Sequence, residues 1–260
     1  LEIDFTRGIA IVFMIIAHIG MFGIITLNNI MKNQTVSGLT AMIFGGIGTI
    51  AHTLFILLVG VNMTTSYNRV KAKHLKMGHD ENETKRQINR EFILKNIRRG
   101  GFIFLLGVLM SVIVKVVFGE WLVFFGIFQF IAVAIVMAIP FTLYYNHITN
   151  ALAIILILVS TNYRNQLDGL SGLSLGFITG NTNRKFIDFF PILPYFSYVL
   201  VGIMIGKMLE GVRLSGMNMR SETVRDLVYT GQNSIQVYFT HLIIIFAIMK
   251  VVIGNKKIAV

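Results

Sequence analysis

The chain has 260 residues, of which 55% are hydrophobic and only 13% are charged, whereas a soluble domain carries about 25% charged residues. This composition indicates an integral membrane protein built from several helices. The formal net charge is +11 and there are no cysteines, which excludes thiolate catalysis, disulfides and cysteine-ligated metals. The basic residues concentrate in polar segments between apolar runs, as in cytoplasmic loops, so no nucleic-acid partner is expected.

Seven apolar runs follow one another and predict an all-α, polytopic integral membrane protein of about seven transmembrane helices. They are Gly8–Leu27, Leu39–Thr64, Gly101–Phe118, Trp121–Tyr144, Ala151–Ser160, Pro194–Leu209 and Ser234–Ile253. The fifth run is short, because a span needs about 20 residues. It either extends back through Tyr145–Asn150 or stops before the far surface. We expect residues 1–260 to form a single transmembrane domain.

The distribution of basic residues predicts that the N-terminus lies inside. The segment 66–100 contains ten lysines and arginines, and the end of the sixth run with the segment after it contains four more, so both are expected on the cytoplasmic side. Alternating charges within 66–100 predict a helical hairpin, which is either simply solvated or a surface for anionic lipid or phosphate groups. Residues 161–193 then form an outer loop, either a lid over a binding site or a plain connector.

One ionisable residue, His18, lies near the middle of the first apolar run. Arg7 lies eleven residues earlier, and at about 100° per residue both side chains share one helix face. With Arg7 at one membrane surface, His18 is roughly 16 Å away, near the middle of the bilayer. An ionisable group is costly there and indicates function, although a neutral histidine bonded to a neighbouring helix fits the same pattern.

The last apolar run carries a second polar stripe. Ser234, Tyr238 and His241 stand at i, i+4 and i+7 and share one helix face, with Asn233 just before them. The stripe predicts either substrate contacts or hydrogen bonds to another helix. A catalytic hypothesis makes His18 a neutral general base, with Ser234, Tyr238 and His241 orienting a substrate or stabilising an oxyanion.

Four further polar residues are candidate binding groups. Asn62 lies at the inner end of the second run, and Gln129 is an amide within the fourth. Arg98 and Arg99 stand where the third run begins, and paired guanidinium groups there suit either phosphate binding or interfacial anchoring. The histidines show no metal-ligand spacing, so no metal site is predicted.

Six segments, taken in order, resemble a known family of membrane-bound acyltransferases. DFTRGIAIVFMIIAH resembles the family's first helix, D-x-x-R-G-h-A followed by an apolar run and a polar residue at the position of His18. The remaining five segments are TLFILLVGVNMTTSY, NIRRGGFIFLLG, VFFGIFQFIAVA, FIDFFPILPYFSYVLVGIMIGK and GQNSIQVYFTHLIII. The last two of these resemble the family's D-Y-F-P-L-L-P-W-h and G-x-x-S-L-x-I-Y-L-x-H helices. Together they resemble the DUF1624 branch, which includes heparan-alpha-glucosaminide N-acetyltransferase and is related to acyltransferase-3.

The resemblance implies acyl transfer from acetyl-CoA on the cytoplasmic side to an amine or hydroxyl of a sugar-like acceptor at the outer face. Gln129 stands where the family usually has a histidine. The expected catalytic residues are His18, Tyr238 and His241. The expected substrate- or CoA-binding residues are Arg7, Asn62, Arg98, Arg99, Gln129, Asn233 and Ser234.

Two other functions are compatible with the sequence. One is a non-catalytic subunit of a membrane complex, whose polar stripes serve only helix packing. The other is a small-solute transporter with histidines as proton carriers, although no inverted repeat is visible between the two halves of the chain. We expect the chain in the cell membrane, surrounded by lipid, with other subunits or a second copy of itself as further partners.

Overall fold

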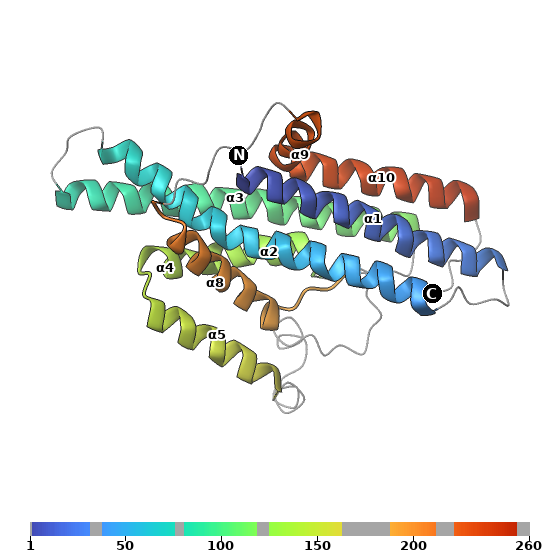
Figure 1. Ribbon diagram of the computed structural model, residues 1–260, viewed down its shortest axis with the longest axis horizontal. Helices are drawn as coiled ribbons and strands as arrows, with labels where there is room; N and C mark the ends of the chain where they lie inside the picture. The colour runs from blue at the N-terminus through green and yellow to red at the C-terminus, as the bar shows by residue number, and fades with distance from the viewer. Residues whose placement is uncertain are drawn as a thin grey trace. The chain divides into compact units, whose positions relative to one another are not determined.

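The computed structural model describes residues 2–31, 38–75, 81–118, 125–162, 188–211 and 221–253. Within these ranges the regular elements are all α-helices, and no strand is present (Figure 1). The helices are α1 (Glu2–Met31), α2 (Gly38–Leu75), α3 (Glu81–Phe118), α4 (Ile127–Leu143), α5 (His147–Asn162), α8 (Ile192–Met208), α9 (Glu222–Gln232) and α10 (Ser234–Ile253). The prediction of an all-α architecture is confirmed for these residues.

Four helices are long and apolar enough to cross a membrane, namely those containing Glu2–Ile24, Gly38–Leu75, Thr84–Val116 and Ser234–Val252. Three shorter apolar helices correspond to the fourth, fifth and sixth predicted runs. Each predicted run therefore overlaps a described helix. Seven spans stay a prediction, because α4, α5 and α8 are shorter than the usual span of about 20 residues. The inside position of the N-terminus also stays a prediction.

Two features of the helices differ from the expected layout. First, α9 forms where only a polar connection was expected, beginning after Ser221 with Glu222 in its first turn, an acidic residue that suits a helix N-terminus. Second, α2 and α3 continue far beyond their apolar runs. The described parts of the basic segment 66–100 are therefore helical, as the hairpin hypothesis predicts, and residues 76–80 lie outside the described residues. Most of the expected outer loop 161–193 also lies outside them.

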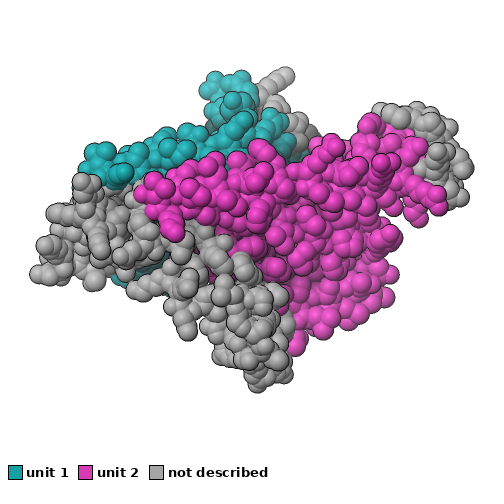
Figure 2. All heavy atoms as spheres, turned by 180° about the vertical axis from the view of Figure 1, so that it is seen from behind, with its two compact units in different colours: residues 1–55, 213–260 teal, residues 56–212 magenta. Residues whose placement is uncertain are grey.

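The chain forms two compact units, which Figure 2 colours separately. Unit 1 comprises Leu1–Phe55 and Arg213–Val260. In it α1 packs against both α9 and α10, and Figure 1 shows α10 running beside α1. The backbones of α1 and α9 approach so closely that a Cβ added to Gly8 would meet the carbonyl of Leu227, and one added to Gly231 would meet the backbone of Asp4. Small residues thus allow the helix contact that positions the site.

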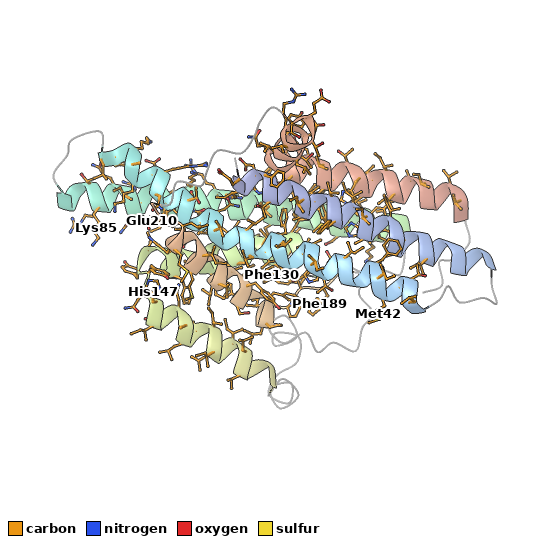
Figure 3. All side chains as sticks on the ribbon, viewed as in Figure 1. Met42, Lys85, Phe130, His147, Phe189 and Glu210 are labelled. Carbon is orange, nitrogen blue, oxygen red and sulfur yellow. The ribbon has the colours of Figure 1, made fainter. Side chains whose placement is uncertain are left out.

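Unit 2 comprises Ile56–Val212, in which α3 packs on α4 and α8 packs on both α4 and α5. The second half of α2 approaches α8 through Gly60 and Gly202, where an added Cβ would meet backbone atoms of the opposite helix. Phe130 of α4 is 1% exposed and packs against the ring of Tyr195, with centroids 6.1 Å apart. Figure 3 marks Phe130 and, in the segment before α8, Phe189.

Candidate functional site

The first and last helices of unit 1 meet at a pair of imidazoles. His18 Nδ1 of α1 lies 2.9 Å from His241 Nε2 of α10. The ring planes differ by only 20° and the centroids are 5.2 Å apart, so the rings meet through their nitrogen atoms, not their faces. The second nitrogen of His241, Nδ1, lies 2.9 Å from the backbone oxygen of Val237. Two residues that sequence analysis selected separately therefore form one hydrogen-bonded unit.

Aromatic side chains hold the imidazole pair in place. Tyr238 stands nearly perpendicular to both rings, with centroids 6.1 Å from His18 and 5.2 Å from His241. Phe22 packs obliquely on His18 at 5.9 Å and meets Phe246 of α10 edge to face at 5.4 Å. These contacts restrict rotation of the imidazoles, because aromatic rings at such distances fill the space around them. Sequence analysis missed both phenylalanines, since an apolar run offers no signal that separates them from lipid-facing neighbours.

The polar stripe of α10 faces the protein interior, as its spacing predicts. Ser234, Tyr238 and His241 are 8%, 7% and 9% exposed, while Ile243 and Ile244 on other faces are more than half exposed. Asn233 lies at the junction of α9 and α10, where its side-chain nitrogen donates to the backbone oxygen of Tyr229 at 2.9 Å.

Arg7 anchors α1 to α9. Its guanidinium donates to Asp4 Oδ1 at 2.9 Å and to the backbone oxygen of Gly231 at 3.0 Å. Arg7 contacts α9 and His18 contacts α10, so both side chains reach the C-terminal helices of unit 1. The contacts give Arg7 a structural task in the helix crossing, and its expected role in binding a substrate stays a prediction.

The other candidate binding residues belong to unit 2. Gln129 is 4% exposed and donates through Nε2 to Ser111 Oγ at 2.9 Å, which in turn donates to the oxygen of Gly107. This chain of bonds joins α4 to α3. Asn62 is partly buried in α2, whereas Arg98 and Arg99 are exposed on α3. Gln129 and the two arginines thus occupy different environments, one internal and one at the surface.

The polar parts of α2 and α3 contact one another, as expected of a hairpin. Lys73 Nζ lies 3.0 Å from Glu91 Oε1, and His74 Nε2 lies 2.7 Å from Glu91 Oε2. Closer to the apolar runs, the rings of Tyr67 and Phe92 meet edge to face at 5.4 Å. The exposed Lys73–Glu91 pair contributes little to stability, whereas Phe92 is fully buried and its packing joins the two helices.

Asp188 is a polar residue that the sequence analysis did not single out. Its Oδ2 accepts a hydrogen bond of 3.1 Å from the backbone nitrogen of Ile127, the first residue of α4. Nearby, the backbone nitrogen of Phe190 donates to the oxygen of Phe125 at 2.9 Å. Burial of the carboxyl raises the pKa of Asp188 to about 6, and the bond from Ile127 opposes that rise. Asp188 and Phe190 thereby fix the start of the segment before α8 to the start of α4.

Among the described residues, no group of three or more histidine, cysteine, aspartate or glutamate side chains is placed to hold a metal ion. The chemistry that this part of the chain offers is that of hydrogen-bonded imidazoles, a phenol and a hydroxyl in unit 1. Such groups move protons and orient acceptors.

The fold and the site define a class: a helical membrane protein whose first and last apolar helices join through a buried imidazole pair. The family model for the catalytic domain of heparan-alpha-glucosaminide N-acetyltransferase matches residues 1–243, a range that includes both histidines. The chain belongs to this family. No curated protein and no solved structure matches it.

Proposed function

We propose that this chain is a membrane N-acetyltransferase, which moves an acetyl group from acetyl-CoA on the cytoplasmic side to an amine of a sugar-like acceptor at the outer face. Two observations support the proposal. The chain belongs to a family described by N-acetyl transfer to a glucosaminide, and His18 pairs with His241 within two apolar helices. A hydroxyl of the sugar-like acceptor is the alternative to the amine in the same acetyl transfer. The proposal also places the chain in the DUF1624 branch.

The role of His18 is that of general base. As the acceptor nitrogen attacks the carbonyl carbon of the acetyl group, the C–N bond forms and His18 takes a proton from that nitrogen. The C–S bond then breaks, and the departing coenzyme thiolate takes up the proton, so the products are an amide and free coenzyme A. Such base catalysis contributes about 10²- to 10⁴-fold to the rate. Ser234 and Tyr238, buried on the same face of α10 as His241, are the proposed contacts to the acceptor.

Arg98 and Arg99 are the proposed contacts to the coenzyme phosphates. Both are exposed on α3, and guanidinium groups bind phosphate through two parallel hydrogen bonds. The proposal keeps the expected binding roles of Asn62 and Asn233. It also keeps those of Gln129 and Arg7, which would support binding indirectly, through the hydrogen bonds that hold their helices together.

The first test measures transfer of labelled acetyl from acetyl-CoA by the purified full chain in lipid nanodiscs, with glucosamine as acceptor and glucose as the hydroxyl-only comparison. We expect transfer to glucosamine and a fall of about 10²- to 10⁴-fold in His18→Ala. His147→Ala is the matched control, because His147 is exposed at the start of α5 (Figure 3). Equal rates in wild type and His18→Ala would exclude His18 from the chemistry.

The same assay separates the donor contacts. Replacing Arg98 or Arg99 with alanine should raise the KM for acetyl-CoA roughly 10-fold or more, because a hydrogen bond to a charged group is worth about 1.5–3 kcal/mol. Arg86→Ala, exposed on the same helix, should leave that KM unchanged. Proton-coupled uptake of a solute into vesicles, without acetyl transfer, would support the transporter instead. Tight co-purification with other membrane chains and no acetyl transfer would support the accessory subunit.

A further inference from the structure

The hydrogen bonds of the imidazole pair have a direction that follows from their last acceptor. His241 Nδ1 lies 2.9 Å from the backbone oxygen of Val237. A carbonyl oxygen carries no proton and can only accept, so the proton in this bond belongs to His241 Nδ1. A neutral imidazole has a single N–H, which leaves His241 Nε2 as an acceptor.

The direction passes on to His18. Its Nδ1 lies 2.9 Å from His241 Nε2, so His18 Nδ1 must donate and must carry the only proton of a neutral ring. The reverse direction requires a doubly protonated His241, which would place a cation within two apolar helices where an unpaired charge is costly. His18 Nε2 is left with its lone pair, and no hydrogen bond to it occurs among the described residues.

We infer that His241 is a positioning residue, which holds His18 in the Nδ1–H tautomer so that Nε2 of His18 is the atom that accepts the proton. The inference rests on the proposed function only for the identity of the proton donor. His241 does not contact the acceptor through its nitrogens, because both are already bonded within the protein. This replaces the expectation that His241 orients the substrate or stabilises an oxyanion.

The arrangement also serves the ring after it has taken the proton. With protons on both nitrogens, His18 still donates from Nδ1 to His241 Nε2, and a hydrogen bond to a charged donor is roughly twice as strong as one between neutral groups. The Tyr238 and Phe22 rings beside His18 keep its plane fixed between the two states. The proton therefore goes to and from one atom without rotation of the ring.

The test uses nitrogen-15 NMR of the full chain labelled at histidine, in lipid nanodiscs, with the His18 signals assigned by their loss in His18→Ala. In the wild type, Nδ1 of His18 should show the signature of a protonated ring nitrogen and Nε2 that of an unprotonated one. His241→Leu removes the acceptor, and the Nε2–H tautomer should become the main form. His241→Gln keeps an oxygen near the position of Nε2 and should restore the Nδ1–H form.

The kinetic measurement follows the same variants. His241→Leu should lower kcat about 10²- to 10⁴-fold with the KM for acetyl-CoA unchanged, and His241→Gln should stay within about 10-fold of the wild type.

An Nε2–H tautomer of His18 in the wild type would overturn the inference whatever the activity. A wild-type rate in His241→Leu would overturn it as well. If every variant, wild type included, lacks acetyl transfer while the tautomers are as expected, the proposed function fails and the positioning role of His241 stands. Should His241→Leu not fold, the wild type and His241→Gln decide the question.

Discussion

The side-chain carboxyl of Asp188, which lies outside α4, caps the N-terminus of this helix. The N–H groups in the first turn of α4 receive no hydrogen bond from a side chain of Gly126, the residue before the helix. Instead, Asp188 accepts a hydrogen bond from the N–H of Ile127, the first residue of α4. A negative charge at this end of a helix is favourable, yet the surroundings of the carboxyl disfavour charge, since its pKa is raised to about 6. The residue therefore changes its contribution to stability in a mildly acidic range.

The pH dependence of stability follows from this shift. The pKa of Asp188 is about 6 in the folded chain against 3.8 for an ordinary aspartate, so the folded state binds the proton more tightly. The resulting stabilisation is complete below about pH 4 and is lost as the pH rises through about 6. We expect the thermal unfolding temperature of the wild type to fall across this interval relative to Asp188→Asn, as followed by intrinsic fluorescence. Parallel curves for the two proteins would contradict the assignment.

At the scale of elements, the contact between α1 and α9 decides where His18 stands. Arg7 bonds the oxygen of Gly231, and Gly8 and Gly231 bring the two backbones together. In a membrane, association of helices depends on such close packing, because lipid gives no hydrophobic drive for one helix to bind another. The Arg-Gly pair of the family motif therefore has a structural explanation in this chain.

Adding one methyl group tests this helix contact. Gly8→Ala and Gly231→Ala place a Cβ against backbone atoms of the opposite helix, and we expect each to cost about 1–3 kcal/mol. Gly23→Ala, in the same helix α1, is the matched control, because no atom of the described residues lies within 4 Å of its added Cβ. This change should be neutral or slightly stabilising. Thermal unfolding in detergent gives the comparison, and equal stability of all three variants would show that the contact is not tight.

At the scale of the whole molecule, the lengths of α2 and α3 exceed what a bilayer requires. Each has 38 residues, and a helix of that length is roughly 57 Å long, whereas the hydrocarbon core is about 30 Å thick. Figure 1 shows both helices continuing past the ends of α4 and α8. The continuation is rich in lysine and arginine, which favours the cytoplasmic side.

The absence of cysteine from the chain makes this orientation easy to test. Arg86→Cys lies on the exposed surface of the hairpin, and Leu39→Cys lies near the opposite end of α2, where Leu39 is 68% exposed. We expect a membrane-impermeant maleimide to label Leu39→Cys in intact cells and Arg86→Cys only after the membrane is permeabilised. The reverse pattern would place the N-terminus outside and remove the acetyl-CoA site from the cytoplasmic face.

The apolar runs of the sequence predicted seven of the described helices, and helical spacing predicted which polar residues share a face. Long apolar runs have few alternatives to helix in a membrane, because each backbone group must find its partner within the segment. Helical period then put Arg7 and His18 on one face and Ser234, Tyr238 and His241 on another. It did not reveal α9, which is short and polar, so that neither length nor hydropathy distinguished it from a loop.

Only the tertiary structure decided which faces meet. His18 and His241 are separated by 223 residues, and periodicity assigns a side chain to a face without naming the helix opposite. The same holds for Gln129, whose amide was visible as a polar residue in an apolar run but whose partner Ser111 was not. Which helix packs against which depends on the shapes of the two helix surfaces and on where small residues let the two backbones approach. These properties belong to a pair of surfaces and cannot be read from one segment alone.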